Sequence, residues 1–106
     1  MIISGGENIY SIEVENALMA HPLITDAAVI GIPDADLGEA LLAFIVVTDP
    51  TVQTSAIITQ CRTLLAGYKI PRRYEIIDAL PRNPSGKVLK NDLRKPFWQG
   101  RGRDVA

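Results

Sequence analysis

The sequence predicts an α+β fold: a small sheet of about three main strands packed with two or three helices, plus a short N-terminal hairpin. Three observations lead to this prediction. Segments 25–32 and 41–48 are dominated by apolar and β-branched residues, whereas 53–66 has apolar residues at helical spacing. With 106 residues, 47% of them hydrophobic, the chain has the usual size of one domain and can bury one modest core.

The N-terminal third predicts the hairpin, a helix and the first main strand. A short apolar start and the Gly5–Gly6 pair predict a tight turn. A helix is expected from Ser11, whose hydroxyl can cap it, to His21, because the following proline disfavours helical geometry at the residue before it. Segment 25–32 is then a strand, and residues 33–38 form a polar loop.

The remaining elements follow from the apolar pattern. Segment 41–48 is a nearly continuous apolar run, which predicts a central strand buried on both faces. Segment 53–66 is an amphipathic helix that ends before Gly67. Its predicted buried face consists of Ile57, Cys61, Leu64 and Leu65.

The last quarter of the chain is expected to be less regular. A short strand over 73–78 is followed by a segment rich in turn formers, 80–87, and by a short helix over 90–95 that ends before Pro96. The chain is therefore expected to form one domain over 1–106, with an ordered core 1–96 and a tail 97–106.

Composition and charge narrow the classes of function. Eleven basic and twelve acidic residues give a formal net charge of -1, so no nucleic-acid partner is indicated. The longest apolar run, 40–47, is too short to span a membrane, which takes roughly 20 residues. The single Cys61 cannot form an internal disulfide, which favours the cytoplasm, and its place on a helical apolar face favours a buried, inert thiol.

Two segments carry candidate chemistry. The first, Ile-Ile-Ser-Gly-Gly-Glu-Asn-Ile-Tyr at 2–10, has a glycine pair whose backbone can approach a ligand closely. The second, Leu-Pro-Arg-Asn-Pro-Ser-Gly-Lys at 80–87, is stiffened by two prolines and ends in the ammonium of Lys87, which can act as a movable charge for a phosphate or carboxylate. Taken alone, an ordinary hairpin turn and a solvated surface lysine are the more common interpretations.

Together, the two segments resemble motifs of the adenylate-forming superfamily, which includes acyl-CoA synthetases, luciferases and the adenylation domains of peptide synthetases. The first resembles the family's glycine-rich motif, with Ser11 where the family usually has proline, and the second resembles its C-terminal lysine motif. The resemblance covers 1–96, and the segment 93–98 resembles bacterial fatty-acyl-CoA ligases. Supporting matches are Glu13-Val14-Glu15, Ala28-Val29-Ile30-Gly31-Ile32-Pro33-Asp34, Leu37-Gly38-Glu39 and Tyr68-Lys69-x-Pro71.

The resemblance implies that the chain is the mobile C-terminal lid domain of an ATP-dependent acid–CoA ligase, with a fatty acid as the expected substrate. In such enzymes a carboxylate attacks the α-phosphate of Mg-ATP, giving an acyl-adenylate and pyrophosphate. The thiol of coenzyme A then displaces AMP. The C-terminal domain rotates between the two steps and presents a different face to the active site each time.

The resemblance also implies roles for individual residues. Lys87 would be the catalytic residue of adenylation, in a loop shaped by Ser85 and Gly86. On the other face, Gly5 and Gly6 would line the tunnel for the thiol of coenzyme A. Two further residues, Tyr68 and Arg72, lie where some members of the family hold the nucleotide end of coenzyme A.

Cofactors and partners are expected mainly in the parent enzyme. No cofactor or metal is expected on this domain alone, whereas the parent would use ATP, Mg and coenzyme A. The expected partners are the missing N-terminal adenylation domain, whose hinge would lie just before Met1, and the acyl-adenylate. A lysine acetyltransferase is a hypothetical regulator that would remove the charge of Lys87.

Alternatives remain open at this stage. The chain could be part of a complete ligase that is inactive alone, a stand-alone module that acts in trans, or a non-catalytic protein that binds coenzyme A or another partner. A metal site formed by Asp34, Asp36 and Glu39 is less favoured than a solvated turn, because the loop has no His or Cys.

Overall fold

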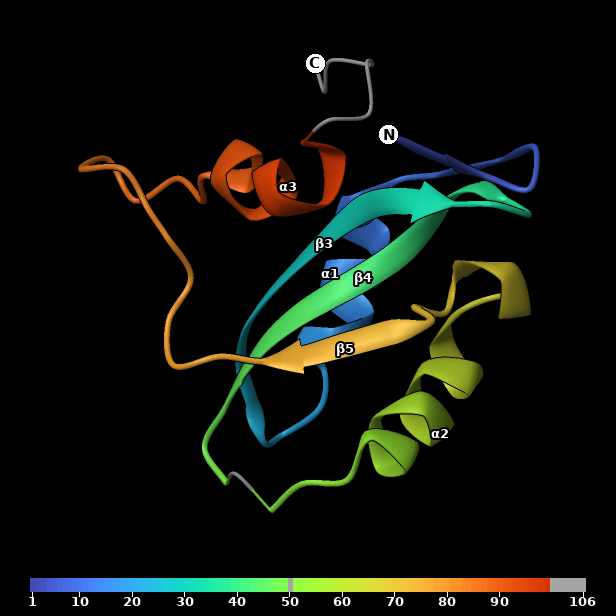
Figure 1. The fold of residues 1–106 in the computed structure, drawn as a ribbon. Helices are drawn as coiled ribbons and strands as arrows, with labels where there is room; N and C mark the ends of the chain where they lie inside the picture. The colour runs from blue at the N-terminus through green and yellow to red at the C-terminus, as the bar shows by residue number, and fades with distance from the viewer. Residues whose placement is uncertain (50, 100–106) are drawn as a thin grey trace.

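The computed structural model describes residues 1–49 and 51–99, and these form a five-stranded sheet with three α-helices (Figure 1). The predicted α+β fold class is confirmed. The elements in chain order are β1 (Ile2–Ser4), β2 (Glu7–Ile9), α1 (Ser11–Met19), β3 (Ile24–Asp34), β4 (Gly38–Val47), α2 (Thr54–Leu64), the 3₁₀ turn η1 (Gly67–Lys69), β5 (Arg73–Ile76) and α3 (Lys90–Trp98).

Strand β4 is the centre of the sheet. It pairs antiparallel with β3 from Val47 to Gly38, parallel with β5 over Leu42–Ile45, and with β1 where Ser4 lies opposite Gly38. The predicted central strand is therefore confirmed. Because β1 continues into the β2 hairpin, the glycine turn lies at one end of the sheet, as Figure 1 shows.

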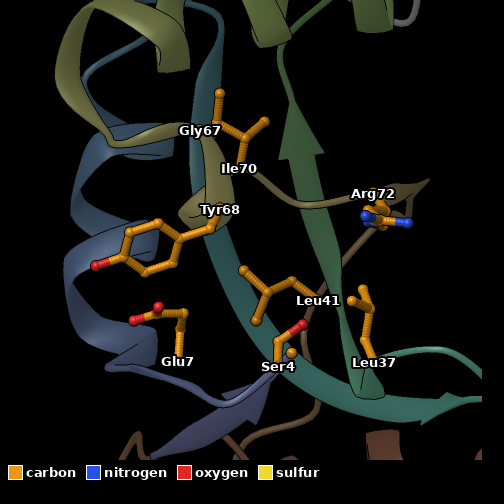
Figure 2. Close-up of a pocket in the computed structure, with 9 residues that line it drawn as sticks. Ser4, Glu7, Leu37, Leu41, Gly67, Tyr68, Ile70 and Arg72 are labelled. Atoms are coloured by element: carbon orange, nitrogen blue, oxygen red, sulfur yellow. The ribbon is translucent and has the colours of Figure 1, made fainter.

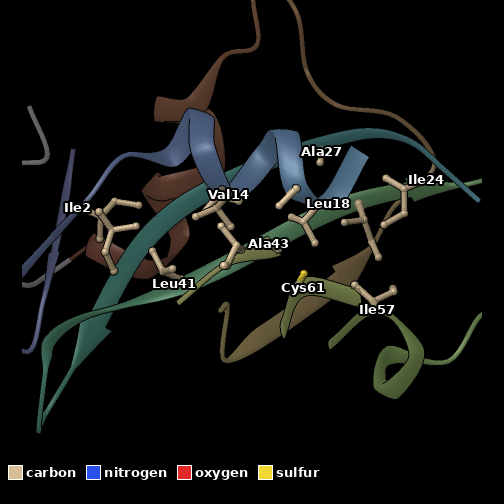
Figure 3. Close-up of a cluster of buried hydrophobic side chains, with 14 residues drawn as sticks. Ile2, Val14, Leu18, Ile24, Ala27, Leu41, Ala43, Ile57 and Cys61 are labelled. Atoms are coloured by element: carbon tan, nitrogen blue, oxygen red, sulfur yellow. The ribbon is translucent and has the colours of Figure 1, made fainter. Parts of the chain in front are cut away.

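Helices cover both faces of the sheet. Alternate residues of β4 point to opposite faces, so Leu41, Ala43 and Ile45 join one buried cluster and Leu42 and Phe44 join the other. The first cluster is closed by α1 and α2 and includes Cys61, which is 1% exposed (Figure 3). The second cluster is closed by α3 and by the segment that leads into it.

Side chains cover the edge of β3 that faces away from β4. The Ala27 N–H donates to Oδ1 of Asp26 at 3.1 Å, and the Val29 N–H donates to Oε2 of Glu15 at 2.8 Å. Further along, Nε1 of Trp98 donates to the Gly31 carbonyl oxygen at 2.9 Å. These bonds satisfy main-chain groups of an edge strand and join α1 and α3 to it.

Several predicted boundaries are wrong. Strands β3 and β4 extend further toward each other than expected, leaving a turn of only 35–37. Helix α1 ends at Met19 rather than at His21, and α2 ends at Leu64, which is 53% exposed and so does not belong to the buried face. The chain leaves α2 at Leu65 in extended geometry, which turns Leu64 outward and Leu65 into the core.

Two predictions about helix ends are also wrong, each for a tertiary reason. Ser11 does not cap α1: Tyr10 occupies the cap position without a side-chain bond, and the Ser11 hydroxyl accepts from Nζ of Lys90 instead. Helix α3 continues through Pro96 to Trp98, because Trp98 is buried against β3. Of the expected tail, 97–99 are therefore described, and 100–106, with Arg101 and Arg103, lie outside the described residues.

Candidate functional site

The glycine turn is a tight connection between β1 and β2. Gly5 and Gly6 have φ of +58° and +82°, a region that side chains disfavour, which explains the glycine pair. The Gly5 N–H donates to the Leu37 carbonyl oxygen at 2.9 Å, so the turn is fixed to the 34–38 connection. A Cβ on Gly5 would lie 3.2 Å from Leu37, whereas one on Gly6 would meet nothing within 4 Å in the described chain.

A groove of about 200 Å³ opens beside this turn and brings together three of the predicted site residues. Its lining includes Gly5, Tyr68 and Arg72, although these come from three separate elements of the chain. Figure 2 shows the Tyr68 ring on one side of the groove and the Arg72 guanidinium on the other, with Leu41 between them. Gly6 belongs to the same turn but does not line this groove.

A ligand in the groove would meet a cation, an aromatic ring and a turn that carries no side chain at Gly5. Arg72 is exposed and can meet a phosphate, and the ring of Tyr68, 49% exposed, can stack on a flat group. Lys69 lies 5.6 Å from the centre of that ring and is bound to Glu13 of α1 at 2.9 Å. The hydrogen bond to Glu13 raises the pKa of Lys69, so the ammonium beside the ring stays charged.

The Lys87 loop, residues 82–88, is closed by main-chain and side-chain bonds. Arg82 and Val88 form an antiparallel bridge, and the Gly86 N–H donates to the Asn83 carbonyl oxygen at 2.9 Å. Inside the loop, Oδ1 of Asn83 accepts from the N–H of Ser85, the hydroxyl of Ser85 and the N–H of Lys87, at 3.1, 2.8 and 2.9 Å. Gly86 has φ of +89°, a backbone geometry that favours glycine at this position of the loop.

Two charged side chains fasten this loop to the sheet and to α1. Arg82 forms an ion pair with Asp26 of β3 and donates to the Gly86 carbonyl oxygen at 2.6 Å. After the loop, Nζ of Lys90 lies 2.7 Å from Oε2 of Glu15. Lys87, between them, is exposed, and its ammonium has no hydrogen bond or ion pair to the residues described. The loop therefore presents one ammonium whose cationic neighbours are already paired.

Of the acidic residues 34, 36 and 39, the first and the last bond main-chain groups of the fold through their carboxylates. Oδ1 of Asp34 accepts the N–H groups of Asp36 and Leu37, both at 2.9 Å, and these bonds lower the pKa of its carboxyl group. Oε2 of Glu39 accepts the Ile3 N–H at 2.9 Å. Within the described residues, no three His, Cys, Asp or Glu side chains gather closely enough to hold a metal ion. None of the described helices has the length and apolar character needed to cross a membrane.

With this geometry in place, comparison with known proteins decides the family. The family model for the AMP-binding enzyme C-terminal domain matches residues 13–87, most of the chain, and its match ends on Lys87. The chain belongs to this family of C-terminal domains. The predicted resemblance is thereby confirmed.

Relatives of this AMP-binding C-terminal domain are much longer than the chain. A fatty acid–[acyl-carrier-protein] ligase of Streptomyces coeruleorubidus is 45% identical over 106 residues, which cover 98% of this chain and 20% of the relative. A feruloyl-CoA synthase of Amycolatopsis is 47% identical over 98 residues, which cover 92% of this chain and 20% of the synthase. The solved structure of a Mycobacterium tuberculosis fatty acyl CoA synthetase superimposes with a TM-score of 0.87 at 43% identity. The superposition covers 92% of this chain and 19% of the synthetase. The chain thus spans about a fifth of these relatives' length.

Some residues that shape the AMP-binding C-terminal domain were not singled out from the sequence. Asn83 had a local signal, because an asparagine before Pro-Ser-Gly is a common start of a side-chain-stabilised turn. Glu15 stands in one of the matched segments, but nothing in the sequence indicated its contact or that of Asp26, because their partners are distant in the chain. The structure brings Gly5, Tyr68 and Arg72 into one groove and leaves Lys87 in a different depression, which shares no lining residue with that groove.

Proposed function

We propose that this chain is the mobile C-terminal domain of an ATP-dependent, AMP-forming acid–CoA ligase and that Lys87 is its adenylation residue. The observation that carries the proposal is the unpaired, exposed ammonium of Lys87 at the end of a closely bonded loop. A surface lysine that only aids solubility needs no such loop. A charge that must reach a reacting group needs a fixed loop, because a small displacement of the charge can greatly lower the rate of the reaction.

In this proposal Lys87 acts on the first of two steps. A carboxylate oxygen attacks the α-phosphate of ATP, the bond to pyrophosphate breaks, and the ammonium stabilises the negative charge that builds up between them. At ~4 Å and an effective dielectric of about 20, one such charge pair is worth roughly 4 kcal/mol before desolvation. This chain's residues would not hold the magnesium ion, which is expected on the N-terminal adenylation domain.

The glycine turn is proposed to serve the second step, in which a thiol displaces AMP from the acyl-adenylate. The backbone at Gly5 and Gly6 would leave room for the thiol arm of coenzyme A, because no side chain projects from the turn. Arg72 and Tyr68 fit the chemistry of its nucleotide end, a phosphate and a flat base. The thiol is the nucleophile that coenzyme A supplies, and the turn only gives it access.

The nature of the acid belongs to the rest of the enzyme. Relatives that match this domain equally well are named for fatty acids and for ferulate, so this domain does not discriminate between them. A fatty acid remains our proposal, from the resemblance of the segment 93–98 and from the relatives named for fatty acids. The chain alone, without a domain to bind ATP and the acid, is proposed to be inactive.

The test separates the two half-reactions in the enzyme that contains this chain. Lys87→Ala should lower acid-dependent exchange of pyrophosphate into ATP by about 100- to 1,000-fold. Formation of acyl-CoA from supplied acyl-adenylate should stay within about twofold, because that step does not need the ammonium. Equal loss in both half-reactions, or none in the first, would contradict the assignment. Acyl-CoA formation by the 106-residue chain alone would contradict its proposed inactivity.

A further inference from the structure

A second lysine follows Lys87 closely and has a very different environment. Lys90 is the first residue of α3, and its Nζ lies 2.7 Å from Oε2 of Glu15 and donates to the hydroxyl of Ser11 at 2.9 Å. The Lys90 side chain is 25% exposed and that of Glu15 is 11% exposed. Solvent and salt therefore screen this pair less than they screen the exposed ion pairs of the molecule.

The same carboxylate oxygen has a second partner. Oε2 of Glu15 accepts the Val29 N–H of the β3 edge at 2.8 Å, so one atom joins α1, β3 and the start of α3. Glutamate is needed for both contacts at once: its oxygen accepts the strand N–H, and its charge holds the ammonium. If the two residues were exchanged, the lysine at position 15 could not accept a hydrogen bond from the Val29 N–H, because an ammonium has no acceptor.

This junction limits how the Lys87 loop can move. The loop is attached to the body of the domain through the Arg82–Asp26 pair before Lys87, and after it through Val88, which packs against the second buried cluster, and through the Lys90–Glu15 pair. Within the loop, the main chain of Lys87 is bonded at both its N–H and its carbonyl oxygen to Asn83. If Lys90 were released, the chain after the loop would lose its polar contact with α1 and β3, and the closed loop could shift and carry the Lys87 ammonium with it.

We propose that Glu15 is a positioning residue for adenylation: by holding Lys90 against α1 and β3, it fixes the place from which Lys87 is presented. The inference rests on the proposed function of Lys87, and it concerns a residue that touches neither substrate. Glu15 is also expected to stabilise the domain, so a test needs a measurement that lost stability alone would leave unchanged.

The first experiment uses Glu15→Gln in the complete ligase. The amide oxygen still accepts the Val29 N–H, but the charge that holds Lys90 is gone. We expect kcat of the adenylation half-reaction to fall by about 10-fold, because the ammonium is displaced while the substrate pockets are intact. KM for ATP and for the acid should not change, and acyl-CoA formation from supplied acyl-adenylate should stay within about twofold.

Variants of Lys90 test whether the pair is the cause. Lys90→Met should lower adenylation as Glu15→Gln does, and the double variant should be no slower than either, because each change breaks the same contact. Lys90→Arg keeps a cation within reach of Glu15 and should keep most of the activity. Glu75→Gln makes the same chemical change in the exposed pair with Arg73 on β5 and should leave both half-reactions unchanged.

The outcomes are distinguishable. If Lys87→Ala abolishes adenylation but Glu15→Gln and Lys90→Met do not slow it, this inference falls and the proposed function stands. If these variants slow both half-reactions equally, the pair is only structural and the inference also falls. If Lys87→Ala leaves adenylation intact, the proposed function fails and the positioning role fails with it.

Discussion

The glycine turn and the Lys87 loop are held in opposite ways. The turn is anchored by the buried side chains of Ile2 and Ile9 and by the backbone bond from Gly5 to Leu37. The Lys87 loop has one isolated strand-like bridge and depends on polar side chains, with Arg82 paired to a carboxylate and Asn83 bonded within the loop. The turn is therefore held mainly by apolar packing and one main-chain bond, whereas the Lys87 loop is held mainly by polar and charged side chains.

The two regions also face different surroundings. The groove beside the turn and the depression around Lys87 have no lining residue in common, and in Figure 1 the hairpin lies at the right-hand end of the sheet whereas the orange loop before α3 lies at the far left. If both regions act on the same reacting atoms, as proposed, the domain has to present them one after the other. This supports the proposal that the domain rotates between the two half-reactions.

The largest expected effect comes from exchanging one glycine in each region. Gly6 and Gly86 both have positive φ, and a Cβ on either would meet nothing within 4 Å in this chain. Gly6→Leu in the complete ligase should slow the thiol step by about 100-fold, because the side chain would project from the turn into the path of the thiol. Adenylation should be nearly unchanged.

Gly86→Leu is the matched control and should give the reverse pattern, with adenylation slowed and the thiol step kept. Both variants should lose a similar stability, about 1–2 kcal/mol, from the left-handed backbone. Melting curves and the two half-reactions measured on both variants check this. If the two variants impair the same half-reaction, the division of labour between the regions is wrong.

An intermediate effect is expected where the two regions share their support. Trp98→Phe keeps an aromatic ring in the core but removes the N–H that donates to the Gly31 carbonyl oxygen. A bond between neutral groups whose loss leaves a buried acceptor unsatisfied costs about 1–3 kcal/mol. Chemical denaturation should show this loss of stability. The rates of the two half-reactions should change by the same factor, or neither should change. A selective loss of one step would mean that α3 supports only one region.

The smallest effect concerns acid at the glycine turn. The N–H groups of Leu37 and Asp36 lower the pKa of Asp34 below its usual value of 3.8. Since the folded-state pKa is the lower one, this stabilisation is complete above the unfolded value and is lost as the pH falls through the folded value. Below about pH 4 the 34–38 turn should therefore loosen.

The Gly5 amide reports this change, because its acceptor is the Leu37 carbonyl oxygen. In an NMR titration of the chain, the Gly5 amide signal should shift with the protonation of Asp34, and Asp34→Asn should remove that shift. Asp49 is a matched control: its bonds to Thr51 lower its pKa in the same way, but it lies in a different connection. A Gly5 signal that follows Asp49 instead would contradict this link.

The sequence predicted the layout of the fold because most of it depends on local patterns. The continuous apolar run of β4 and the helical spacing of α2 identified both elements and most of their buried residues, Leu64 excepted. Element ends were predicted less well. Proline inside a helix costs about 3 kcal/mol, which argued for an end before Pro96. The burial of Trp98 against Gly31 opposes that cost, and no local pattern contains this contact.

The site was predicted unevenly for the same reason. Lys87 and the glycine pair stand in contiguous motifs, so their positions in turns could be read directly from the sequence. That Tyr68 and Arg72 share a groove with Gly5 depends on the pairing of β5 and β1 with the same strand. The contact between Glu15 and Lys90 joins residues 75 positions apart, and a helix surface glutamate is the ordinary interpretation of Glu15 alone.

The covered edge of β3 has a consequence for handling the domain on its own. An edge strand with free main-chain groups invites a strand from another molecule, which leads to aggregation or domain swapping. Here Asp26, Glu15 and Trp98 occupy those groups. Shortening the chain before Trp98 would uncover the Gly31 carbonyl oxygen, so a chain that stops at Lys95 should precipitate more readily than one that keeps the whole of α3.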